Sequence, residues 1–162
     1  MQLYDTARRA IVAFEPNDHV LMYTCGITPY DATQLGHAAT FIAYDVLKRR
    51  LLDKGHTGRC IRNGTDGDAP LFAKARELGI HYLDLAAGEE ARFERDMEAL
   101  NALPVAAAPR ASSAIPDIRG FIGMVLDRGF AYESGGSVYF DVSKFGSFGS
   151  LSHYTDDEML ML

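Results

Sequence analysis

A strand, a helix and a second strand follow one another directly near the start of the chain, and this succession constrains the fold more than any other feature. The apolar run at 19–25 is closed by Gly26, which is typical of a buried strand that ends in a loop. From Gly36 to Gly55 apolar residues recur at helical spacing, and 57–62 again has the character of a strand. Two such strands pair in parallel, because the helix carries the chain back to the edge where the first strand began. The sequence therefore predicts an α/β fold with a parallel sheet.

The rest of the chain divides at a stretch that contains two prolines. Apolar residues at helical spacing predict two further helices at 71–78 and 83–103. Residues 104–110 have no periodicity, which predicts a linker. The elements expected beyond it are a helix at 113–126 that Ser113 caps, a β-hairpin at 132–142 and an amphipathic segment at 156–162. We therefore expect two parts, 1–104 and 105–162.

The composition is typical of a folded protein in water. The chain has 162 residues, of which 48% are hydrophobic and 23% charged, so it can bury a core. It has neither a run of about 18 to 20 apolar residues nor an apolar signal core, so we expect a cytoplasmic protein with no membrane partner. Its two cysteines, Cys25 and Cys60, fit a reducing compartment. The net charge of -6 argues against loose, charge-driven binding to nucleic acid, although it leaves room for a specific docking patch.

Two loops should meet at one crevice, because the carboxyl ends of parallel strands lie at the same edge of a sheet. The first loop begins at Cys25, whose thiolate could bind zinc or act as a nucleophile; the alternative is a buried apolar cysteine. The second loop, 63–68, carries an amide, a hydroxyl and two carboxylates; the alternative is a surface turn. Either loop alone is a weak signal.

A third candidate, Gly36 with His37, lies at the start of the long predicted helix. The first turn of a helix has unpaired N–H groups and a partial positive charge, which attract phosphate. Glycine allows a nucleotide to approach the backbone closely, and an imidazole can donate a hydrogen bond to the phosphate oxygens. The alternative is an ordinary histidine in a tight turn at the helix start.

The order of these motifs resembles that of a known family. The run at 23–40, YTCGITPYDATQLGHAAT, followed by IRNGTDGD, is similar to the N-terminal half of the catalytic domain of class I cysteine-activating enzymes. The family includes cysteinyl-tRNA synthetase and the cysteine ligase of mycothiol biosynthesis. The resemblance implies a Rossmann-like parallel sheet whose N-terminal half is 1–104, and a connective α+β insertion that begins at 105–162. It also implies that ATP and L-cysteine form cysteinyl-adenylate and pyrophosphate, after which an acceptor takes the cysteinyl group.

The two branches of the family differ in the acceptor. CGITPYDAT, LGHAAT, PLFAKA and SHYTDDEML resemble the mycothiol ligase, whose acceptor is the amine of glucosaminyl-inositol. GFAYES and VYFDVSKF lean toward the synthetase, whose acceptor is tRNA(Cys). We favour the ligase and keep the synthetase as the alternative. A non-catalytic nucleotide-binding paralogue is a further alternative.

The resemblance assigns roles to single residues. Cys25 matches the first zinc ligand of the family, and Thr28 and Thr65 match positions that contact the cysteinyl moiety. The positions that the resemblance assigns to ATP are Gly26, Gln34, Gly36 and His37. No catalytic side chain is implied, because adenylate formation needs no general base.

Several features depart from the family pattern. Gln34 stands where the family has the first histidine of its HIGH-type motif, and Ala69 replaces a usual aspartate. The remaining zinc ligands and the lysine-rich loop belong to the second half of the family's domain. We therefore expect this chain to be an incomplete, inactive part of an ATP-dependent ligase that pairs with a C-terminal half or self-associates.

Overall fold

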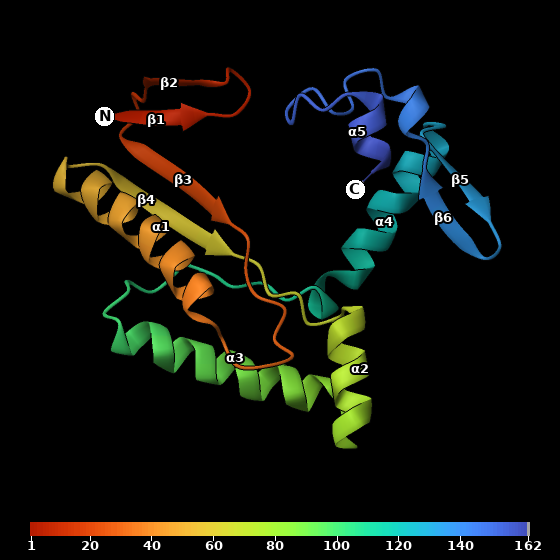
Figure 1. Ribbon diagram of the computed structural model, residues 1–162, viewed down its shortest axis with the longest axis horizontal. Helices are drawn as coiled ribbons and strands as arrows, with labels where there is room; N and C mark the ends of the chain where they lie inside the picture. Colours follow the sequence, from red (N-terminus) through yellow and green to blue (C-terminus); the bar gives the residue numbers. More distant parts are fainter. Residues whose placement is uncertain (162) are drawn as a thin grey trace. The chain divides into compact units, whose positions relative to one another are not determined.

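The computed structural model describes residues 1–161 and separates into two compact units (Figure 1). One unit is Pro16–Ile115, and the other combines Met1–Glu15 with the residues from Pro116 onward. This division falls at different residues from the predicted one after residue 104. The predicted boundary separates two parts of the family's catalytic domain and not two compact units. It therefore stays a prediction.

A parallel βαβ arrangement forms the centre of the unit Pro16–Ile115. Its elements are β3 (His19–Thr24), α1 (Leu35–Asp53) and β4 (Thr57–Arg62). The two strands pair in parallel from His19 opposite Thr57 to Thr24 opposite Arg62. Figure 1 shows α1 running alongside this pair of strands. The predicted elements and the predicted parallel sheet are confirmed.

The predicted linker at 104–110 is wrong in part, because this segment pairs with the sheet. Ile61 and Ala107 form a parallel bridge, and the N–H of Arg62 donates to the carbonyl of Ala107 at 3.1 Å. The N–H of Gly64 donates to the carbonyl of Pro109 at 2.8 Å. Proline lacks an N–H but keeps its carbonyl, so it can accept from a neighbouring strand. The segment thus lies beside β4 as a short third strand would.

Two helices complete this unit, α2 (Ala69–Leu78) and α3 (Tyr82–Ala99). The α2 helix ends at Gly79, whose φ of 68° is the left-handed conformation that glycine adopts at low cost. The α3 helix ends before the predicted residue 103, because Asn101 turns the chain with a φ of 58°. Two buried clusters stabilise the unit. One consists of Ile27, Phe41, Phe93 and Met97, and the other of Leu71, Ala75, Leu85 and Ala86.

Phe93 is the most buried residue of the first cluster, so its truncation tests the packing. Its side chain is 1% exposed, and its ring meets that of Phe41 edge to face at 5.0 Å between centroids. We expect Phe93→Ala to lower the free energy of unfolding by about 3–5 kcal/mol, since it leaves a cavity. Leu35→Ala is the control, because Leu35 is 90% exposed and should change stability by less than about 0.5 kcal/mol. If urea denaturation showed the same loss of unfolding free energy for Phe93→Ala and Leu35→Ala, this packing would be contradicted.

The other unit contains two hairpins and short helices. Its elements are β1 (Gln2–Asp5), β2 (Ala10–Ala13), α4 (Ile115–Asp127), β5 (Ala131–Ser134), β6 (Ser137–Phe140), η2 (Val142–Lys144) and α5 (Asp156–Leu160). The predicted helix and the hairpin with Gly135 and Gly136 at its turn are confirmed. The hairpin β1–β2 was not predicted. Residue 162, the end of the predicted amphipathic segment, lies outside the described residues.

The start of α4 differs from the expected cap. A short helical turn, η1 (Ser112–Ala114), precedes α4, and Ser113 lies within it. The Ser113 hydroxyl donates to the carbonyl of Arg110 at 2.8 Å. Among the helices of residues 1–161, none combines the length and the apolar character needed to cross a membrane.

Candidate functional site

The loops that follow β3 and β4 lie side by side and are joined by hydrogen bonds. The N–H of Gly26 donates to Oδ1 of Asn63 at 2.8 Å, and the N–H of Thr65 donates to the carbonyl of Ile27 at 3.1 Å. Both strands end at these loops, as a parallel pair requires. The predicted meeting of the two loops at one edge of the sheet is therefore observed. We call the space that they border the crevice.

Close contact between the loops explains the glycine at position 26. A Cβ built on Gly26 would stand 1.5 Å from the carbonyl oxygen of Asn63, which is fixed backbone. By contrast, a Cβ on Gly67, in the second loop, would meet nothing within 4 Å. Only a residue without a side chain allows the first loop to approach the second this closely.

This contact predicts the outcome of a pair of substitutions. Gly26→Ala should force the loops apart and lower the free energy of unfolding by about 1–3 kcal/mol, the usual cost of overpacking. Gly67→Ala should leave the stability within about 0.5 kcal/mol of the original. Thermal denaturation of both variants provides the measurement. A Gly26→Ala variant as stable as Gly67→Ala would show that the loops do not touch.

Cys25 is exposed, whereas Cys60 is buried. The alternative interpretation of Cys25 as a buried apolar cysteine is therefore wrong. However, no group of three or more His, Cys, Asp or Glu side chains within the described residues could hold a metal ion. Zinc sites use three or four protein ligands, so the side chains described here do not by themselves form the zinc site that the resemblance implies.

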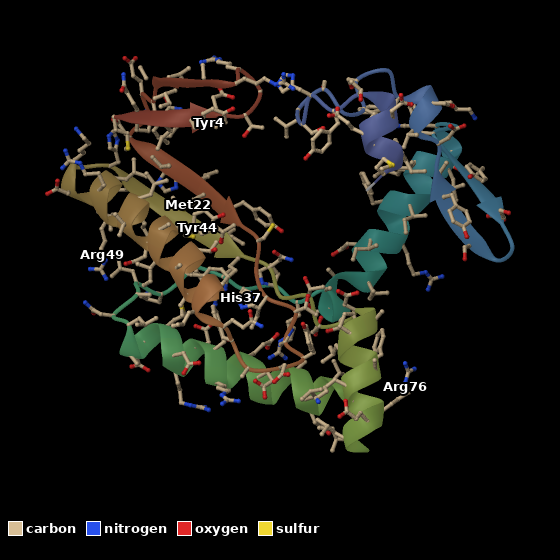
Figure 2. All side chains as sticks on the ribbon, in the orientation of Figure 1. Tyr4, Met22, His37, Tyr44, Arg49 and Arg76 are labelled. Carbon is tan, nitrogen blue, oxygen red and sulfur yellow. The ribbon has the colours of Figure 1, made fainter. Side chains whose placement is uncertain are left out.

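The start of α1 presents His37 in a defined tautomer. The N–H of Gln34, the N-cap residue, donates to Nδ1 of His37 at 3.3 Å. A ring nitrogen that accepts a hydrogen bond carries no proton, so a neutral His37 has its proton on Nε2. Figure 2 shows His37 on α1 close to the loop that leads into this helix. The exposed His37 therefore offers an N–H donor beside the helix start.

The surroundings of this helix start favour an anion. The first turn of α1 contains no acidic residue, so its partial positive charge is not compensated. A Cβ on Gly36 would meet nothing within 4 Å, which means that the space next to the backbone is open. Gln34 is exposed as well. The predicted phosphate-binding residues thus lie at an accessible helix N-terminus.

The polar residues of the second loop have separate tasks. The Asp66 carboxylate is 1% exposed and accepts from the N–H of Ser112 at 2.8 Å and from the Ser112 hydroxyl. Asp68 is the N-cap of α2. Both carboxylates therefore fix backbone. Thr65 is half-buried, as is Thr28 in the first loop, and Thr65 accepts from Nδ2 of Asn63 at 3.3 Å.

Sequence reasoning missed Arg62, the last residue of β4. Its side chain is buried, and its guanidinium lies over the rings of Phe41 and Phe93, at 5.3 Å and 4.5 Å from their centroids, and pairs with Glu94. Arg62 lines two cavities, one of about 320 Å³ and one of about 300 Å³. The only available signal was an arginine that follows two apolar residues at a strand end, which does not distinguish a buried side chain from an exposed one.

A parallel βαβ unit whose two strands end in neighbouring loops is typical of α/β domains that bind a ligand at the carboxyl ends of their strands. Comparison with known sequences makes the class specific. Residues 11–161 match the family described as tRNA synthetases class I (C) catalytic domain. The chain therefore belongs to this class I synthetase family, as its motifs predicted, and the Rossmann-like α/β fold class is confirmed.

Relatives from both branches of the family are similar to this chain. The L-cysteine:1D-myo-inositol 2-amino-2-deoxy-alpha-D-glucopyranoside ligase of Stackebrandtia nassauensis is 46% identical over 99% of this chain and 38% of its own length. That of Thermobispora bispora is 41% identical over 100% of this chain and 40% of its own length. The cysteine--tRNA ligase of Thermosynechococcus vestitus is 42% identical over 94% of this chain and 32% of its own length. The chain thus spans about two fifths or less of the length of these relatives.

Proposed function

We propose that this chain supplies the first part of an ATP-dependent ligase that activates L-cysteine and transfers it to the amine of an amino-sugar inositol. The observation that carries the proposal is the pair of hydrogen-bonded loops, one of which begins at the exposed Cys25 while the other contains Thr65. The similarity to the Stackebrandtia nassauensis ligase supports the acceptor. A cytoplasmic location, and pairing with a C-terminal half or self-association, remain predictions.

In the proposed reaction a carboxylate oxygen of cysteine attacks the α-phosphorus of ATP. The bond from that phosphorus to the bridging oxygen breaks, and pyrophosphate leaves with the electron pair. The cysteine carboxylate is already ionised at neutral pH, so no side chain has to remove a proton. Nε2–H of His37 and the N–H groups at the start of α1 would bind phosphate oxygens and stabilise the charge that moves onto pyrophosphate. Gly26, Gln34 and Gly36 would border the nucleotide.

We propose that Cys25 contributes its sulfur to cysteine selection as one ligand of a zinc ion. The described residues provide one such ligand, so the others would have to come from outside them. Thr28 and Thr65 would contact the cysteinyl moiety. These assignments rest on the family resemblance and on the exposure of Cys25.

The second candidate function is cysteine attachment to tRNA, which the similarity to the Thermosynechococcus vestitus enzyme favours. A single set of assays separates the candidates. Residues 1–162 replace the matching part of the Stackebrandtia nassauensis ligase, and the chimeric protein is tested for cysteine-dependent exchange of pyrophosphate into ATP. Transfer to glucosaminyl-inositol is then compared with transfer to tRNA(Cys). Pyrophosphate exchange that does not require cysteine would count against activation of cysteine. The absence of exchange in the presence of cysteine would count against it as well and would favour the non-catalytic alternative.

A further inference from the structure

The carboxylate of Asp66 joins the second loop of the crevice to the turn that leads into α4. Its Oδ1 accepts from the N–H of Ser112 at 2.8 Å, and its Oδ2 accepts from the Ser112 hydroxyl. Ser112 is the first residue of η1, which continues directly into α4. Because Asp66 is almost fully buried, little water competes for these two bonds. A side chain of the crevice loop thus holds a helix start that lies 46 positions further along the chain.

The residue before η1 explains why this turn depends on a distant side chain. The N–H groups at the start of a helix have no partner within the helix, and a polar side chain at the N-cap position usually accepts from one of them. The N-cap residue of η1 is Ala111, whose side chain has no acceptor. The negative charge of Asp66 is also favourable beside the partial positive charge of a helix start. The crevice loop therefore caps η1 in place of Ala111.

Backbone pairing between the loop and the preceding segment stops short of η1. The N–H of Gly64 donates to the carbonyl of Pro109 at 2.8 Å, and the N–H of Ala111 donates to the carbonyl of Gly64 at 2.9 Å. Within the described part of the chain, the hydrogen bonds that reach η1 from this loop are those of Asp66. The other compact unit begins at Pro116, shortly after η1. Asp66 thus holds the segment through which the chain enters that unit.

We infer that Asp66 is a positioning residue that couples the crevice to this turn, so that a ligand that holds the second loop also stabilises the capped form of 112–114. The inference rests on the proposed function, because it takes the ligand to be a cysteinyl-adenylate. Helix ends fray, so the turn exchanges between a capped and an uncapped form. A ligand that fixes the loop fixes the carboxylate with it and favours the capped form. Coupling is reciprocal, so losing the cap must weaken ligand binding by the factor by which the ligand strengthens the cap.

Two substitutions weaken the cap from its two sides. A carboxylate accepts both hydrogens of Ser112, whereas the amide of Asp66→Asn accepts one and forms no charge-assisted bond. Ser112→Ala removes the hydroxyl bond and leaves Asp66 charged. Asp68→Asn is the control for the first, because it removes the same charge from the same loop and keeps a good cap for α2. Ser113→Ala is the control for the second, because the Ser113 hydroxyl donates to the carbonyl of Arg110 and not to the loop.

The first measurement is amide hydrogen exchange in the ¹⁵N-labelled 162-residue chain, with and without saturating cysteinyl-sulfamoyl adenosine. We expect this probe to slow exchange at the Ser112 amide by about fivefold or more, the lower end of typical coupling. The slowing should be largely lost in Asp66→Asn and kept in Asp68→Asn. The Gly64 amide is the internal reference, because its bond to Pro109 does not involve the Asp66 side chain.

The second measurement is the affinity for the same probe by isothermal titration, with the melting temperature of each variant. Asp66→Asn should bind the probe more weakly by about fivefold or more, the factor seen in hydrogen exchange. Ser112→Ala should weaken binding by a smaller factor, because it keeps the bond from the backbone N–H. Asp68→Asn and Ser113→Ala should stay within about twofold of the unaltered chain.

The outcomes distinguish two kinds of failure. An unaltered chain that does not bind the probe contradicts the proposed function, and the inference falls with it. Binding that leaves exchange at the Ser112 amide unchanged overturns the inference alone. So does an Asp66→Asn variant that melts earlier but binds with full affinity, because Asp66 would then only stabilise the fold. If Asp66→Asn fails to fold, full affinity of Ser112→Ala overturns the coupling.

Discussion

Cys25→Ala is expected to reduce cysteine-dependent pyrophosphate exchange in the chimeric ligase by about 1,000-fold or more. Residues that only support a metal ligand already change metal affinity or activity by about 10–100-fold, so losing the sulfur itself should cost more. The fold should be unaffected, since Cys25 is exposed. Exchange is measured as the incorporation of labelled pyrophosphate into ATP at several cysteine concentrations, together with the melting temperature and the zinc content.

Cys60→Ala is the control for Cys25→Ala. Cys60 is buried in β4, so the variant should lose stability while keeping cysteine-dependent exchange. The role of Cys25 would be refuted by a Cys25→Ala variant that exchanges normally. A Cys25→Ala variant that loses exchange only because it unfolds would be recognised from its melting temperature.

His37→Ala is expected to lower the rate of exchange by about 100-fold, because removing one fixed donor from a developing negative charge usually costs this much. The substitution also removes the acceptor for the N–H of Gln34, so a small loss of helix stability is expected. His19→Ala is the control, because His19 is exposed at the opposite end of β3 and should leave the exchange unchanged.

His37→Asp separates the two roles of the imidazole. A carboxylate can still accept from the N–H of Gln34, and a negative charge in the first turn of a helix is stabilising. The same charge repels phosphate. We therefore expect His37→Asp to be at least as stable as the original chain and yet less active than His37→Ala. If the more stable of the two variants, His37→Asp or His37→Ala, were also the more active, a role of His37 in phosphate binding would be contradicted.

The βαβ unit could be predicted from the sequence because its signals are long and local. The strands at His19–Thr24 and Thr57–Arg62 lie where the apolar runs are, and α1 follows the helical spacing between them. The hairpin β1–β2 was missed because each strand has four residues, too few to establish a period. The segment 104–110 was missed because its pairing with β4 is non-local.

The candidate site was predictable in outline only. Topology alone places Cys25 and Thr65 in neighbouring loops, because parallel strands end at the same edge. The contacts that give the loops their shape depend on distances in space between residues, and the spacing of residues along the sequence does not determine these distances. Thus the Asp66 carboxylate and the Asn63 amide were both candidate functional groups, but Asp66 is buried against Ser112 and Asn63 joins the two loops.

We expect a cysteinyl-adenylate to bind between the loops after β3 and β4, next to the start of α1. The most direct test is an NMR titration of the ¹⁵N-labelled 162-residue chain with a cysteinyl-sulfamoyl adenosine. The largest shifts should occur at the amides of Gly26, Gly36, His37 and Thr65, with small shifts in the hairpin β5–β6. Shifts that spare these four amides, or that concentrate on β5–β6, would contradict it.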